Sequence, residues 1–283
     1  MKLLKVSCCT RGAGDIFAAM WAVQAARDAG WRVEFYTFAG AAQDVARLFL
    51  PAENVHDVER QKWELFLPHE GNNVATMGTP RTRWFHSRLP GSICGEKPVM
   101  PRPVESVVSN EEFAGKTMLF PFSFYSEREW PLPRFIQTAK LLELQGHDCL
   151  IVGPENRLGL VRALGWQKCC SFASWLELSC AMLAARMVVG NDSGPMNAAG
   201  SLGVPCVAVH AQMSARGLAG DYPTVRSVVP SWPGTCAGCH WQGFAGYQQG
   251  HCVRGMCREL ELISPKSVVA AVMSFSQTVG KQV

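Results

Sequence analysis

A tight turn between an apolar strand and a small-residue helix carries the residues best suited to bind a phosphate. The turn is Asp192-Ser193-Gly194-Pro195, with a buried strand predicted at 186–190 and a helix at 194–202. Unpaired backbone N–H groups and the helix dipole both favour negative charge at a helix N-terminus. We therefore expect Ser193 and the N–H groups of Gly194 and Met196 to meet a diphosphate, with Asp192 holding the turn or a sugar hydroxyl. The alternative is a purely structural turn and cap.

Four cysteines form a second cluster with metal-ligand spacing, in a Gly-rich segment over 234–258. They are Cys236, Cys239, Cys252 and Cys257. Four thiolates at such spacing can enclose one tetrahedral zinc or iron ion, with His240 and His251 as reserve ligands. The segment has little core of its own, so the metal would supply its folding energy rather than chemistry. Disulfides or four unrelated buried thiols are the alternatives.

The elements that must position these residues alternate between strands and helices. In the first half the pattern predicts strand 3–9, helix 15–29, strand 32–38 and helix 41–49. In the second half it predicts strand 117–122, helix 133–145, strand 148–153, helix 155–164, strand 168–170, helix 174–184 and strand 205–210, with a last helix from Ser264. Four prolines mark a linker over 89–116. We predict two α/β domains, 1–110 and 111–283, the second including the cysteine finger.

Composition excludes several classes of protein. With 283 residues, 48% hydrophobic and 18% charged, the chain can bury full cores and is globular. No apolar run approaches the roughly 20 residues of a transmembrane helix, and the N-terminus lacks a secretory pattern, so we expect a cytoplasmic protein. The net charge of +4 is dispersed, and the finger holds only Arg254 and Arg258, so no nucleic-acid partner is expected.

Four ordered segments together resemble the heptosyltransferase-like glycosyltransferases of family 9. They are Gly12-Ala-Gly14-Asp15, the segment 119–134 with Arg128-Glu129-Trp130-Pro131, Ile151-Val-Gly153-Pro154-Glu155, and the stretch 192–205. The resemblance implies a glycosyltransferase-B architecture of two Rossmann-like domains facing a cleft. The donor site would lie in the second domain and acceptor contacts mainly in the first. The implied reaction is an inverting, metal-independent transfer of heptose from an ADP-activated donor.

The same resemblance gives three further residues a role. Asp15 is the implied base or acceptor-positioning group, the alternative being an N-cap carboxylate. Arg128 takes the place of the family's phosphate-neutralising lysine, the alternative being a surface ion pair with Glu127 or Glu129. Glu155 follows a strand and precedes a helix, where an acid can accept hydrogen bonds from ribose hydroxyls or cap the helix.

The chain departs from the family pattern in two places. Asn197 stands where the family usually has histidine, and His210-Ala-Gln212-Met-Ser214 replaces Gly-Pro-Thr. We expect Asn197 to contact the nucleotide sugar, since an asparagine can donate a hydrogen bond, although it cannot carry charge. A non-catalytic relative that binds a nucleotide sugar or a partner is therefore the second hypothesis. Some protein-modifying members of the family carry a similar iron-holding cysteine finger. The acceptor, whether a glycan, lipid or protein hydroxyl, and a homo-oligomeric state stay open.

Overall fold

The computed structural model describes residues 2–8, 12–58, 65–67, 80–91, 98–211, 215–230, 247–248, 251–252 and 257–279. The first half contains β1 (Lys2–Cys8), α1 (Ala13–Asp28), β2 (Trp31–Thr37), α2 (Ala41–Arg47), η1 (Ala52–Asn54), β3 (Val55–Asp57), β4 (Leu65–Leu67) and α4 (Arg81–Ser87). Its strands form one parallel sheet in the order β3-β2-β1-β4.

The second half builds a larger parallel sheet. Its strands are β5 (Lys116–Phe120), β6 (Asp148–Val152), β7 (Cys169–Cys170), β8 (Met187–Asn191), β9 (Cys206–Val209) and β10 (Val225–Val228). Its helices are η2 (Glu111–Phe113), η3 (Ser126–Arg128), α5 (Leu132–Glu143), α6 (Glu155–Ala163), α7 (Trp175–Ala184), α8 (Gly194–Leu202), α9 (Ala215–Ala219), η5 (Arg258–Leu262) and α10 (Pro265–Val279). A two-stranded antiparallel ribbon, β11 (Tyr247–Gln248) and β12 (His251–Cys252), follows β10 in the chain.

The strand order of this sheet is β10-β9-β8-β5-β6-β7, with every pairing parallel. The chain starts in the middle, at β5, builds outward through β6 and β7, and then returns to build from β8 in the opposite direction. This is the doubly wound order in which ligands bind at the carboxyl ends of the two central strands. The α/β class with parallel sheets, predicted from the sequence, is confirmed.

Both faces of the larger sheet are buried, which explains its near-continuous apolar strands. Along β8, Met187 and Val189 face the core under α5, α6 and α10, whereas Val188 faces the core under α7 and α8. At the end of α8, Gly203 has a φ of 75°, a left-handed C-cap conformation that glycine adopts without strain. The predicted strand–turn–helix–strand unit at 186–210 is confirmed.

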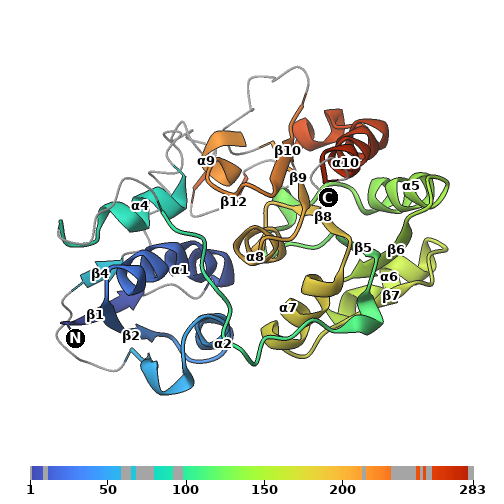
Figure 1. The fold of residues 1–283 in the computed structure, drawn as a ribbon. Helices are drawn as coiled ribbons and strands as arrows, with labels where there is room; N and C mark the ends of the chain where they lie inside the picture. The colour runs from blue at the N-terminus through green and yellow to red at the C-terminus, as the bar shows by residue number, and fades with distance from the viewer. Residues whose placement is uncertain are drawn as a thin grey trace.

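One hydrophobic core runs through both halves of the chain, because side chains of both halves pack around α1. Residues 16–26 of α1 are all buried, and Figure 1 shows α1 lying beside α8, between the two sheets. The Trp21 Nε1–H donates to Ser201 Oγ across this interface at 3.0 Å. The halves are also joined at Asp221, which accepts from Thr82 Oγ1 (2.5 Å) and Arg83 Nε (2.7 Å).

The sequence pattern missed α4, α9 and β10, as well as the ribbon β11–β12 and the short 3-10 helices. All of them are short, and α4 carries Trp84 and Phe85 against the shared core without a helical apolar repeat. The predicted linker has no regular secondary structure over 98–110. Backbone hydrogen bonds nevertheless tie it to both halves, from Val104 N–H to Leu48 O and from Asn110 N–H to Cys180 O. Among the described residues, no helix is long and apolar enough to span a membrane.

Candidate functional site

The Asp192-Ser193 turn lies at the carboxyl end of β8, one of the two central strands. Ser193 is the N-cap residue of α8, but its side chain makes no capping hydrogen bond and its Oγ donates instead to Asn191 O at 3.2 Å. Serine at this position usually accepts from the N–H groups of the first turn. Because Ser193 does not, these N–H groups of α8 suit an anionic ligand.

Arg128 reaches this turn from the other central strand. It lies in η3, which follows β5, and its Nη1 is 3.8 Å from Asp192 Oδ2. Both side chains are mostly buried, 14% and 5% exposed, and the Arg128 guanidinium also lies over the Tyr125 ring at 5.0 Å. The alternative of a surface ion pair between Arg128 and Glu127 or Glu129 is wrong, because Arg128 and Glu127 are both mostly buried and Glu129 pairs with Arg157.

The N-terminus of α1 meets the N-terminus of α8. A Cβ built on Gly14 would lie 3.0 Å from Asn197 Nδ2, and one built on Gly194 would lie 3.8 Å from the Ala13 Cβ. Asp15 is half-buried in the first turn of α1, beside this junction, where a carboxylate interacts favourably with the helix dipole. The N-cap alternative for Asp15 is wrong, because Gly12 occupies that position.

Asn197 serves the structure of the turn. Its Nδ2 donates to Ser193 O at 3.0 Å, and its Oδ1 accepts from the Tyr222 hydroxyl at 3.0 Å. The side chain is 3% exposed, so its contact to a ligand stays a prediction for which this arrangement leaves little room. The structure thus brings Arg128, Asp192, Ser193 and Gly194 together, with Asp15 beside them on α1.

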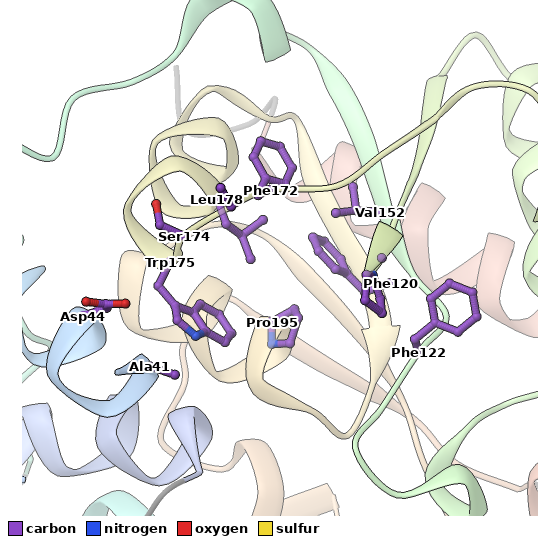
Figure 2. A pocket seen from close by; sticks show the side chains of 13 residues that line it. Ala41, Asp44, Phe120, Phe122, Val152, Phe172, Ser174, Trp175, Leu178 and Pro195 are labelled. Carbon is purple, nitrogen blue, oxygen red and sulfur yellow. The ribbon is translucent and has the colours of Figure 1, made fainter. Parts of the chain in front are cut away.

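A pocket of about 460 Å³ opens next to the turn, at the carboxyl ends of β5, β6 and β7. Its walls are mainly aromatic and apolar, formed by Phe120, Phe122, Val152, Phe172, Trp175 and Leu178. Pro195 of α8 links the pocket to the turn, and Ala41 and Asp44 of α2 close it from the first half. Figure 2 shows Trp175 between Asp44 and Pro195. Flat apolar walls of this kind suit an aromatic ring such as a nucleobase.

Glu155 lies at the edge of this pocket rather than in it. Gly153 and Pro154 line the pocket, but the Glu155 carboxylate is 69% exposed, accepts from Ser171 Oγ at 2.9 Å and lies 3.8 Å from Arg162 Nη1. Pro154 is the N-cap residue of α6, so Glu155 does not cap that helix. Its predicted contact to ribose hydroxyls stays a prediction, and would require the carboxylate to turn away from Ser171.

The predicted metal site falls largely outside the described residues. Cys236 and Cys239 are not described, only the backbone of Cys252 is, and Cys257 is half-buried against the core under α10. In the part of the chain that the structure describes, no group of three or more metal-binding side chains comes together. The cysteine finger and its ion therefore stay predictions.

The sequence alone did not predict the pocket, nor that Asp44 and Trp175 line it. The Trp175 ring packs edge-on to Phe17 at 5.4 Å, and a Cβ on Gly194 would lie 2.8 Å from its Cη2. One signal was available: Phe122 ends the predicted strand 117–122 and Phe172 follows the predicted strand 168–170, at the edge where such sheets bind ligands. Asp44 comes from the other half of the chain, and nothing local to it indicates a pocket.

No protein-family model and no curated protein sequence matches the chain, but solved structures do. The iron-containing dodecameric glycosyltransferase TibC from enterotoxigenic E. coli matches with a TM-score of 0.71 and 14% identity over 99% of this chain and 78% of that one. E. coli heptosyltransferase WaaC with ADP matches at 0.69 and 11%, over 96% and 100%. The family 9 glycosyl transferase from Veillonella parvula matches at 0.66 and 13%, over 97% of both. The chain therefore has the fold of the heptosyltransferases and family 9 glycosyltransferases.

Proposed function

We propose that this protein is a glycosyltransferase that moves a sugar from a nucleoside diphosphate to an acceptor hydroxyl, with inversion at the anomeric carbon. The observation that carries the proposal is the position of the Arg128–Asp192 pair. It lies between the two central strands, beside the N-terminus of α8 and next to a pocket large enough for a nucleobase. Solved structures of the same fold are a heptosyltransferase with ADP and TibC with ADP-D-β-D-heptose.

In this reaction Asp15 would accept the proton of the acceptor hydroxyl as its oxygen attacks the anomeric carbon. The bond from that carbon to the diphosphate oxygen breaks, and the electron pair leaves with the diphosphate. Arg128 and the first-turn N–H groups of α8 would stabilise the charge that develops there. Arg128 would then exchange its contact with Asp192 for one with the diphosphate, so a cation already held at the site replaces a metal ion.

The pocket supports an amino-bearing base such as adenine. Among its described lining residues Asp44 is the charged one, and a carboxylate only accepts hydrogen bonds. Adenine presents an amine to such a group, whereas uracil presents two carbonyl oxygens and a single N–H. This supports an adenine nucleotide in the donor, and the solved structure of TibC with ADP-D-β-D-heptose supports heptose as its sugar. The acceptor, a glycan, lipid or protein hydroxyl, stays part of the proposal, as does a cytoplasmic location.

We also propose that Cys236, Cys239, Cys252 and Cys257 hold a structural zinc or iron ion. The similar TibC is described as iron-containing, and the four-thiolate set supports either metal. No step of the reaction depends on it.

The test is donor turnover by the purified full chain. We expect release of ADP from ADP-heptose, directly or with an added acceptor, and a loss of at least about 100-fold in Asp15→Asn and Arg128→Gln. The matched controls are Glu53→Gln and Arg32→Gln, which change exposed residues of the first half. Turnover that survives both site variants would contradict the assignment.

A second function, donor binding without transfer, is favoured by Asn197. Its amide is held between Ser193 and Tyr222, so it offers no charge where the family pattern has histidine. ADP binding combined with no turnover of any sugar nucleotide would select this alternative.

A further inference from the structure

We propose that Arg157 and Glu129 are positioning residues for the diphosphate site, holding the segment that carries Arg128. This role depends on the proposed function, because it assumes that Arg128 meets a diphosphate. Neither residue is assigned there to donor or acceptor, and they come from two elements, α6 and the turn after η3.

The pair has fork-to-fork geometry. Arg157 Nη1 is 2.5 Å from Glu129 Oε1, and Nη2 is 2.8 Å from Oε2. The backbone N–H of Ser123 also donates to Glu129 Oε1 at 2.8 Å. Two parallel charge-assisted bonds fix orientation as well as distance, and Glu129 is only 14% exposed, so solvent screens the pair weakly. A lysine at position 157 would not reproduce this geometry.

This pair is one of several anchors that follow Arg128 directly. At the next residue, the Trp130 N–H donates to Asn191 Oδ1 at 2.9 Å, and Asn191 Nδ2 donates to Pro121 O at 2.8 Å. The Arg128 backbone itself donates to Tyr125 O at 3.0 Å. The Asn191 anchor ties the segment to β8, and the Arg157 anchor ties it to α6.

Arg157 also contacts the pocket wall. Its guanidinium lies over the Phe122 ring at 4.2 Å, and Phe122 packs against Gly153, where an added Cβ would overlap the ring. One side chain thus supports both the segment with Arg128 and the wall beside the pocket.

The pair also neutralises the Glu129 carboxylate next to Arg128. Glu129 adjoins Arg128 in sequence, and a carboxylate released from Arg157 would be a new anionic partner for the Arg128 guanidinium. It would then compete with the diphosphate for that cation. Loss of Arg157 would therefore weaken phosphate binding twice, by loosening the segment and by freeing a competing anion.

The competing explanation is that Arg157 itself binds phosphate. The isosteric Glu129→Gln separates the two, because it removes the carboxylate that occupies Arg157 while leaving both arginines in place. If Arg157 contacts the phosphate directly, Glu129→Gln should bind ADP more tightly than the wild type. If the pair positions the segment, both Glu129→Gln and Arg157→Gln should bind ADP more weakly.

The experiment is calorimetric titration of the full chain with ADP and with AMP, in the wild type, Arg157→Gln, Arg157→Lys and Glu129→Gln. The ratio of the AMP to the ADP dissociation constant isolates the second phosphate, a readout that a merely structural loss would not change. We expect this ratio to fall by on the order of tenfold in Arg157→Gln and severalfold in Glu129→Gln, with partial recovery in Arg157→Lys. Arg32→Gln, from an exposed pair with Glu34, is the control.

An unchanged ratio in Arg157→Gln and Glu129→Gln would overturn the positioning role, as would tighter ADP binding by Glu129→Gln. If the wild type binds neither nucleotide, the proposed function fails and this role fails with it. If the wild type binds ADP and only the ratios stay constant, the proposed function stands and this inference alone is lost.

Discussion

Trp175 packs closely against Gly194 at the candidate site, and this contact gives a sharp test of the geometry. We expect Gly194→Ala to destabilise the protein, because the new Cβ would lie 2.8 Å from Trp175 Cη2, closer than side-chain carbons normally come. Trp175 cannot simply move aside, since its ring packs against Phe17 in the shared core.

The expected loss follows from two opposing effects. Overpacking a well-packed site costs about 1–3 kcal/mol, while alanine is favoured over glycine in a helix by up to about 1 kcal/mol. The net loss should be about 1–2 kcal/mol, or a fall in melting temperature of roughly 2–6 °C for a chain of this size. Urea unfolding and thermal melts measure both.

A double-mutant cycle identifies the cause. Trp175→Phe removes the part of the ring that meets Gly194, so the double variant should lose about 1 kcal/mol less than the sum of the single losses. The control is Gly159→Ala in α6, where an added Cβ meets nothing within 4 Å, and which should be neutral or slightly stabilising. Additive losses, or an unaffected Gly194→Ala, would refute the described contact between α7 and α8.

Three further predictions concern other parts of the molecule. Burial, and secondly the charge of Arg186, lower the pKa of His147 below its usual 6.5, so the unfolded chain binds the proton more readily than the folded chain. The stability of the protein should therefore fall as the pH drops below about 6.5. Thermal melts between about pH 5 and 7.5 should show a smaller fall in His147→Gln than in the wild type. Asp221→Ala removes two hydrogen bonds that join the halves and should lower the free energy of unfolding by about 1–3 kcal/mol in urea titrations. An unchanged free energy of unfolding would contradict this prediction. Purified protein should contain about one zinc or iron ion per chain by elemental analysis, reduced in a Cys236→Ser, Cys239→Ser variant, whereas equal metal content in both would exclude the finger.

The sequence predicted well those features that depend on neighbouring residues. The strand, turn and helix around Asp192 follow from a short apolar run, a proline in the first helical turn and a glycine at the helix end. Each of these residues sets the backbone locally, so no knowledge of the rest of the fold is needed. The doubly wound class follows in the same way from the alternation of such units.

The contacts that complete the site depend on packing between distant segments. The Arg128–Asp192 pair joins the segment after β5 to the turn after β8, and the Glu129–Arg157 pair joins that segment to α6. The sequence alone offered Glu127 or Glu129 as a partner for Arg128, since adjacent opposite charges suggest a pair. The fold instead turns the two side chains toward different elements, because Glu129 also accepts from the Ser123 N–H.

The central claim is that a nucleoside diphosphate binds between Arg128, the start of α8 and the aromatic pocket. A crystal structure of the full chain with ADP tests it most directly. We predict the diphosphate within hydrogen-bonding distance of the Arg128 guanidinium and of the first-turn N–H groups of α8, with the base among Phe120, Phe172 and Trp175. ADP bound elsewhere, with the Arg128–Asp192 contact intact, would contradict the account.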